Sequence, residues 1–101
     1  MKKVKCFMCE ESASQPGKYI IRPIHENFYL DYTEGSFNII SARLMGLTYA
    51  QYLRMCRDIY GAEIIGKNSL YPLPIFKPSQ ELNNLINELN NRANLILENM
   101  E

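Results

Sequence analysis

Three cysteines and one histidine are the residues of this sequence whose chemistry could support metal binding or nucleophilic catalysis. Cys6 and Cys9 are separated by two residues, the spacing of half a zinc knuckle, and Cys56 and His25 could complete a set of four. A structural zinc ion is bound by four ligands in a tetrahedron. The spacing of the three cysteines and the histidine in this sequence matches no recognised zinc motif. They would converge if the N-terminal strand lay over the central helix. We expect small buried thiols and a turn histidine, with no metal and no cofactor.

A catalytic constellation is equally hard to assemble from the sequence. Cys9 with His25 is the only candidate pair of a nucleophile and a base. There is no glycine-rich phosphate loop and no pair of carboxylates spaced to share a face. The odd number of cysteines fits reduced thiols, and no apolar run approaches the roughly 20 residues of a membrane span. We expect a cytoplasmic protein that is not an enzyme.

The composition suits a single globular domain over residues 1–101, since 47% of the residues are hydrophobic. Basic and acidic residues both number 11, so the whole chain has no net charge. The charges are unevenly spread. The segment from Arg43 to Lys77 contains five basic and two acidic residues. The segment from Pro78 onward contains one arginine and four glutamates. The middle of the chain is therefore basic and its tail acidic.

The first part of the chain, residues 1–35, is predicted to be rich in β structure. Alternation of charged and apolar side chains over Lys3–Met8 predicts a short strand. Two runs rich in Tyr, Ile and Phe, Lys18–Ile24 and Phe28–Thr33, predict a β-hairpin. Pro23 cannot donate to a ladder, so the first of these runs should end there or lie at an edge.

The middle part, residues 36–77, carries a strong helix-start signal. Thr48 followed three residues later by Gln51 is a capping box, which predicts a helix from Tyr49. Gly61 is placed to close this helix in the left-handed conformation.

Three further elements surround this helix. Ser36 is expected to cap a preceding helix over Phe37–Met45. The apolar runs Ala62–Ile65 and Leu70–Phe76 predict a second hairpin, in which Pro72 and Pro74 make the outer strand an edge or an extended arm. The last part, residues 78–101, is predicted to be a long amphipathic helix capped by Ser79.

Ala42, Gly46, Leu47 and Thr48 together supply the small residue, the turn glycine, the following apolar residue and the capped second helix of a known motif. In this the sequence resembles the helix-turn-helix DNA-binding family, and the hairpin over residues 62–76 resembles the wing of its excisionase-like and MerR-like members. The resemblance implies an α+β, winged helix-turn-helix-like domain with an N-terminal β-hairpin and a C-terminal amphipathic helix.

The same resemblance implies that the helix over residues 49–60 reads double-stranded DNA in the major groove. Glutamine can pair bidentately with adenine and arginine with guanine, while residues at the hairpin tip would meet the backbone. The expected DNA-binding residues are Arg43, Tyr49, Gln51, Arg54, Arg57, Lys67 and Asn68. We expect a DNA-binding transcription regulator of phage or mobile-element type.

The apolar stripe of the C-terminal helix is expected to offer a seam to a partner. The interface residues predicted on it are Leu82, Leu85, Leu89 and Ile96. A homodimer formed there would set two recognition helices about 34 Å apart on DNA. The alternative hypothesis is a small phage-encoded inhibitor of a host defence system, of anti-CRISPR or anti-repressor type, that acts through protein–protein contacts. This likeness rests on the small size and balanced charge of the chain and not on a motif.

Overall fold

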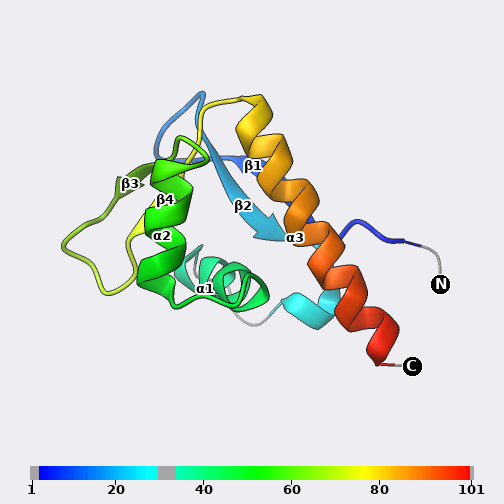
Figure 1. Cartoon of the computed structure of the whole chain (residues 1–101). Coiled ribbons are helices and arrows are strands. Elements are labelled where there is room, and N and C mark those ends of the chain that lie inside the picture. Colours follow the sequence, from blue (N-terminus) through cyan, green and yellow to red (C-terminus); the bar gives the residue numbers. More distant parts are fainter. Residues whose placement is uncertain (1–2, 30–33, 101) are drawn as a thin grey trace.

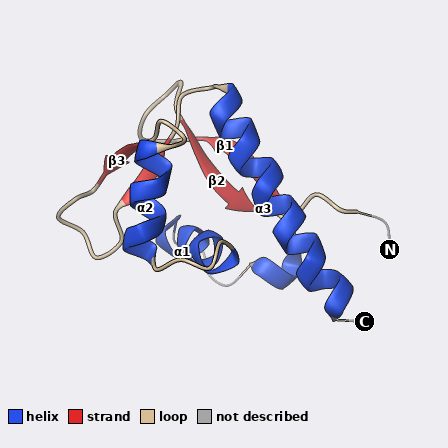
Figure 2. Ribbon diagram, in the orientation of Figure 1, coloured by secondary structure: helices blue, strands red, loops and turns tan. Residues whose placement is uncertain are grey.

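Two small antiparallel sheets and three α-helices make up the α+β fold of this chain, seen in a computed structural model that describes residues 3–29 and 34–100 (Figures 1 and 2). The elements are, in order, β1 (Phe7–Glu11), β2 (Tyr19–Pro23), the short 3-10 helix η1 (Glu26–Phe28), α1 (Glu34–Leu44), α2 (Tyr49–Asp58), β3 (Glu63–Ile65), β4 (Leu73–Ile75) and α3 (Gln80–Asn99). Of the helices described, none is both long and apolar enough to span a bilayer.

The N-terminal hairpin pairs different strands from those predicted. β2 pairs with β1 in an antiparallel register that runs from Phe7 opposite Pro23 to Glu11 opposite Tyr19. The predicted partner run begins in η1 instead, because the His25 side chain accepts from the Asn27 N–H and turns the chain. The rest of that run, residues 30–33, lies outside the described residues. Pro23 is the last residue of β2, as expected.

The predicted strand over Lys3–Met8 is displaced toward the C-terminus. The backbone of Val4 bonds to the Asn94 side chain on α3, and only from Phe7 onward does the chain pair with β2. The alternating pattern therefore identified an extended segment, but its first residues pair with a helix. Side-chain amides on α3 supplied partners that a period-two pattern cannot reveal.

The turn between α1 and α2 is closed by Gly46, which has a φ of +71°. Leu47 donates its N–H to the Ala42 carbonyl at 3.0 Å and Gly46 donates to the Arg43 carbonyl at 3.0 Å. These two bonds form a Schellman motif, which satisfies the last carbonyls of α1. At its other end α1 begins at Glu34, so Ser36 lies within the helix and the prediction that it caps Phe37–Met45 is wrong.

The capping box of α2 is confirmed. Thr48 Oγ1 accepts from the Gln51 N–H at 3.2 Å, and Gln51 Oε1 accepts from the Thr48 N–H at 3.0 Å. α2 ends at Asp58, and Gly61, with a φ of +71°, lets the Ala62 N–H reach back to the Cys56 carbonyl.

The second hairpin is confirmed with shorter strands than predicted. Glu63 lies opposite Ile75 and Ile65 opposite Leu73, so residues 66–72 form a long exposed loop. Pro74 lies within β4, which is tolerated because β4 has no further partner along most of its outer edge. Tyr19 and Phe76 exchange backbone hydrogen bonds of 2.8 Å, which join the two hairpins.

α3 runs diagonally across the N-terminal hairpin and brings the end of the chain beside η1 (Figure 1). Ser79 caps it as predicted, accepting from the Leu82 N–H. Leu82, Leu85 and Leu89 are buried in the main hydrophobic cluster with Phe7. The predicted interface is corrected for these three leucines, because a partner could reach them only if α3 were unpacked. Ile96 alone of the four predicted residues is exposed.

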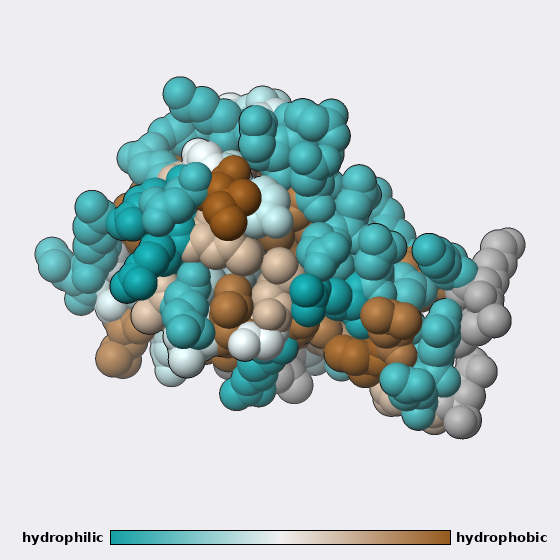
Figure 3. Space-filling model, in the orientation of Figure 1, coloured by the Kyte–Doolittle hydropathy of each residue, from teal (hydrophilic) through white to brown (hydrophobic). Residues whose placement is uncertain are grey.

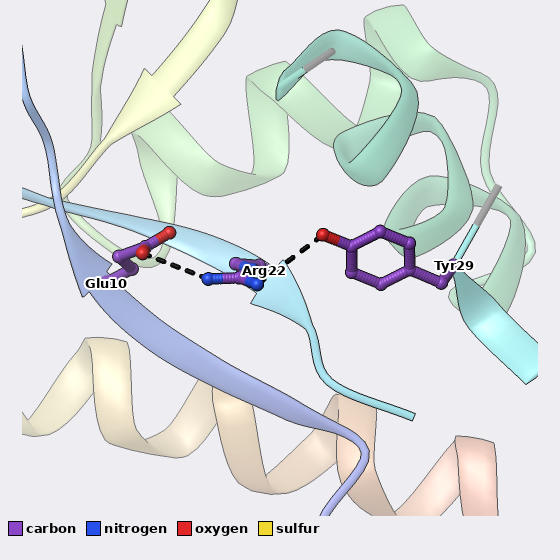
Figure 4. A network of polar contacts seen from close by, with 3 residues as sticks. All are labelled: Glu10, Arg22 and Tyr29. Atoms are coloured by element: carbon purple, nitrogen blue, oxygen red, sulfur yellow. Dashed lines mark hydrogen bonds and ion pairs between the residues drawn. The ribbon is translucent and has the colours of Figure 1, made fainter. Parts of the chain in front are cut away.

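A polar network on the sheet connects β1, β2 and the segment after η1 (Figure 4). Arg22 on β2 donates to Glu10 on β1 at 3.0 Å and to the Tyr29 hydroxyl at 3.4 Å. Its guanidinium also lies 5.9 Å from the Tyr29 ring centroid, within cation–π distance. Tyr29 in turn contacts Phe37 of α1, so the network positions the first helix against the hairpin.

Candidate nucleic-acid interface

The outward face of α2 carries the side chains that could meet a ligand. Ala50, Gln51, Arg54 and Arg57 are exposed at helical spacing, while Tyr52 and Cys56 on the opposite face are fully buried. This division follows from the 3.6-residue period, which puts residues three and four apart on one side. α2 therefore presents two arginines and an amide on the side that faces away from the core.

A groove of about 620 Å³ lies between α2 and the second hairpin. Arg54 and Arg57 line it from α2, and Lys67 lines it from the β3–β4 loop. Among the described residues, Glu63 is the one acidic residue that lines it, and a 2.6 Å hydrogen bond from Lys18 lowers the pKa of this carboxyl. The Lys18 partner offsets the charge of Glu63, so the three basic residues dominate the groove.

The two arginines differ in their partners. Arg57 bonds to Asp58 at 2.8 Å, and this hydrogen bond lowers the pKa of Asp58. Both side chains are exposed, so their pairing is weak and can be exchanged for a phosphate. Within the described part of the chain, no carboxylate lies at ion-pair distance from Arg54. Arg54 is therefore the arginine most available to an incoming ligand.

Tyr49, which is half-buried, makes contacts within the fold. Its hydroxyl donates to the Pro72 carbonyl, and its ring lies 6.5 Å from those of both Tyr52 and Tyr71. Burial raises the pKa of this half-buried hydroxyl. Tyr49 thus anchors the β3–β4 loop to the start of α2.

Gln51 has two predicted roles that compete in this structure. Its Oε1 already accepts from the Thr48 N–H in the capping box. Bidentate pairing with adenine needs both the oxygen and the nitrogen of the amide, so it would require this bond to break. Arg54 can be used without breaking either the capping bond of Gln51 or the ion pair of Arg57.

The remaining predicted residues lie away from this groove. Arg43, near the end of α1, lines a separate hollow of about 220 Å³ with Phe28 and Ile96. Asn68 is exposed in the β3–β4 loop but is not part of the groove wall. The structure therefore brings together Arg54, Arg57 and Lys67 out of the seven predicted DNA-binding residues.

Two exposed residues of the β3–β4 loop were missed by the sequence reasoning. Leu70 is 90% exposed and Tyr71 is 54% exposed, in the same loop as Lys67. The sequence assigned both to a strand over residues 70–76, where alternate residues would be covered. Pro72 and Pro74 had indicated an edge or an extended arm, and the arm lies over the residues before Leu73, where β4 begins.

The cysteines and the histidine do not gather. Cys6 and Cys56 are buried, Cys9 is half-buried, and the His25 ring lies 6.0 Å from that of Phe28. Burial raises the pKa of the Cys56 thiol to about 12. Over residues 3–29 and 34–100, no three His, Cys, Asp or Glu side chains are grouped in a way that could hold a metal ion.

Hydrophilic side chains cover most of the face shown in Figure 3, and hydrophobic ones gather over the C-terminal part of α3. The exposed apolar residues of that part are Leu95, Ile96 and Met100. They lie on a different element from the basic groove.

Comparison of the chain with protein-family models, with curated proteins and with solved structures finds no match.

Proposed function

We propose that this chain is a non-enzymatic DNA-binding regulator of winged helix-turn-helix type that reads DNA with α2. The observation that carries the proposal is the groove in which Arg54, Arg57 and Lys67 meet. These residues come from two elements, a capped helix and the loop of the hairpin that follows it. A recognition helix with a wing at its side has this arrangement of basic residues.

Each basic residue has a distinct role in this proposal. α2 has 10 residues, which makes it about 15 Å long, and a helix of this kind enters a major groove about 12 Å wide. Arg54, free of an ion pair, would donate to the edge of a guanine. Arg57 and Lys67 would meet phosphates, which add affinity without sequence preference.

The homodimer is part of the same proposal, with a smaller seam than the sequence indicated. Ile96 and its neighbours Leu95 and Met100 are the apolar residues that α3 leaves exposed near its end. Sedimentation of the wild type and of an Ile96→Asp variant tests this point. The variant should be monomeric if the seam lies there, and an unchanged oligomeric state would contradict the proposal.

Selection from a random-sequence duplex pool at about 50 and 200 mM salt tests the DNA proposal directly. The wild type should enrich a motif that the Gln51→Ala/Arg54→Ala variant loses. Thr48→Ala is the matched control, because it removes the capping bond at the same helix end and keeps both reading side chains. Loss of the motif in this control as well would mean that helix stability, not base contact, explains the result.

A second candidate function is that of a protein-directed inhibitor, favoured by the exposed Leu70 and Tyr71 in the β3–β4 loop. Leucine and tyrosine exposed together on a loop are suited to a protein contact. Absence of DNA binding even at low salt would favour this function. A pull-down with the Leu70→Ser variant as control would then be the next step.

A further inference from the structure

Asparagine side chains on α3 hold the N-terminal segment by its backbone. Val4 donates its N–H to Asn94 Oδ1 at 2.9 Å, and Asn94 Nδ2 donates to the Val4 carbonyl at 2.8 Å. Asn90 repeats the pattern with Phe7, accepting from its N–H at 2.7 Å and donating to its carbonyl at 3.3 Å. Each carboxamide thus takes the place of a neighbouring strand residue.

The outer edge of β1 continues past these two contacts. Ile24 donates to the Cys6 carbonyl and Ser12 donates to the Lys18 carbonyl, both at 2.8 Å, so the even-numbered residues Met8 and Glu10 between them turn their backbone groups toward β2. The odd-numbered residues must then turn theirs outward, as Phe7 does toward Asn90. Cys9 and Glu11 therefore present backbone donors and acceptors along a free sheet edge.

A groove of about 710 Å³ lies along this edge and α3. Such a volume falls within the roughly 300–1,000 Å³ of ligand sites. Amides line its α3 side, and the exposed Asn87 and Asn83 stand one and two turns before Asn90, respectively. Their side chains make no hydrogen bond within the described residues. The amides that line the groove are Gln80, Asn83, Asn87, Asn90, Asn91 and Asn94.

The charge of this groove is of one sign. Lys3 and Lys5 line it at the end where the N-terminal segment enters, and no aspartate or glutamate is among its described lining residues. Met8, Cys9 and Ile86 supply an apolar floor. A ligand for this surface would combine a hydrogen-bonding backbone, apolar side chains and negative charge.

We propose that the groove binds an extended, acidic peptide segment of a partner protein, which adds to the edge of β1. The peptide backbone would bond to Cys9 and Glu11 on one side and to the amides of Asn83 and Asn87 on the other. This is strand addition, in which main-chain bonds give affinity and alternate side chains enter pockets. Acidic residues of the peptide would meet Lys3 and Lys5.

Main chain is the favoured occupant because the protein already uses this recognition on itself. Asn90 and Asn94 each pair one amide with the N–H and the carbonyl of a single residue, a match that peptide backbone provides at every non-proline position. Asn83 and Asn87 continue the same row of α3 in the direction in which β1 runs. The proposal does not depend on DNA binding by α2, since the two sites share no residue.

A displayed library of random octapeptides, selected on the full-length protein, tests this proposal. Parallel selections use Asn83→Ala/Asn87→Ala as the groove variant and Asn68→Ala/Asn99→Ala as the control, which changes two exposed asparagines outside the groove. Wild type and control should enrich acidic peptides without proline, and the groove variant should not. Circular dichroism of each variant establishes that it is folded.

A synthetic peptide from the selection provides the quantitative test. Its affinity should fall at least about tenfold in the groove variant and also when proline replaces alternate residues. Amide exchange at Cys9 and Glu11 should slow when it binds. The proposal is overturned if no acidic family is enriched, if the groove variant enriches the same peptides, or if oligothymidylate competes for the groove with the same dependence on Asn83 and Asn87.

Discussion

Asn94 and Val4, 90 residues apart in the sequence, are joined by two hydrogen bonds between one side-chain amide and one peptide unit. Asn94 is buried, and its Nδ2 also donates to the Asn90 carbonyl at 2.7 Å. An unpaired amide in such a position would cost about 1–3 kcal/mol, so the helix and the N-terminal segment depend on each other. The segment around Val4 and α3 are in this way folded as one unit.

Replacing Asn90 by alanine should destabilise the fold by about 2 kcal/mol, because the N–H groups of Cys6 and Phe7 both lose their acceptor. Urea unfolding of the variant measures this loss. Asn91→Ala, an exposed neighbour with no side-chain bond in the described residues, serves as control and should change stability by less than about 0.5 kcal/mol. Equal effects of the two substitutions would contradict the structural role of Asn90.

Gly46→Ala should cost about 1–2 kcal/mol of folding free energy. A methyl group at this position would meet no atom within 4 Å, so the expected cost arises from the φ of +71° alone. Gly46→Asn should recover much of the loss, since asparagine tolerates the left-handed region. An alanine variant as stable as the wild type would show that the turn does not hold this conformation in solution.

The sequence predicted the elements whose signals are local. The capping box at Thr48, the turn at Gly46 and the cap at Ser79 depend on residues a few positions apart, and all three have the expected geometry. The basic groove was predicted in part for the same reason, since Arg54 and Arg57 share one face of α2. The β3–β4 hairpin, which the sequence also predicted, places Lys67 on the same groove as the two arginines.

The pairing of the N-terminal segment could not be predicted, because it depends on contacts between distant residues. Asparagine has low helix propensity, and nothing local in the sequence marks Asn90 and Asn94 as partners of a distant backbone segment. Their bonds to Val4 and Phe7 form only once β1 and α3 lie side by side. Likewise, the role of Tyr49 follows from its contact with Pro72, 23 residues away.

Thr48→Ala should lower the free energy of unfolding by about 1 kcal/mol, because the N–H of Gln51 loses its acceptor. Thr48→Ser keeps the hydroxyl and should lose less than half as much. Thermal unfolding of both variants gives the comparison. A serine variant as unstable as the alanine variant would attribute the effect to the threonine methyl group and not to the cap.

Lys67→Ala should weaken binding to all DNA sequences alike and reduce the salt slope by about one, as the loss of one phosphate contact does. Lys5→Ala removes one positive charge from the other groove, between the edge of β1 and α3, and should leave the salt slope unchanged. Binding of a fixed duplex over a range of salt concentrations gives both slopes. Identical slopes for the wild type and Lys67→Ala would remove the β3–β4 loop from the proposed interface.

Alkaline pH should destabilise the fold in part through Cys56. Burial raises the pKa of this thiol from 9.0 to about 12, so the folded chain keeps a proton that the unfolded chain releases. The stabilising contribution is complete below about pH 9 and is lost as the pH rises toward 12, with a limiting slope of about 1.4 kcal/mol per pH unit.

In Cys56→Ala, the fall in unfolding free energy between about pH 8 and pH 10 should be about 1 kcal/mol smaller than in the wild type. Urea unfolding in reducing buffer at both pH values measures this difference, and the value at the lower pH separates the packing cost of the substitution from the titration. An equal fall in the two proteins would mean that the thiol is accessible to water in the folded state.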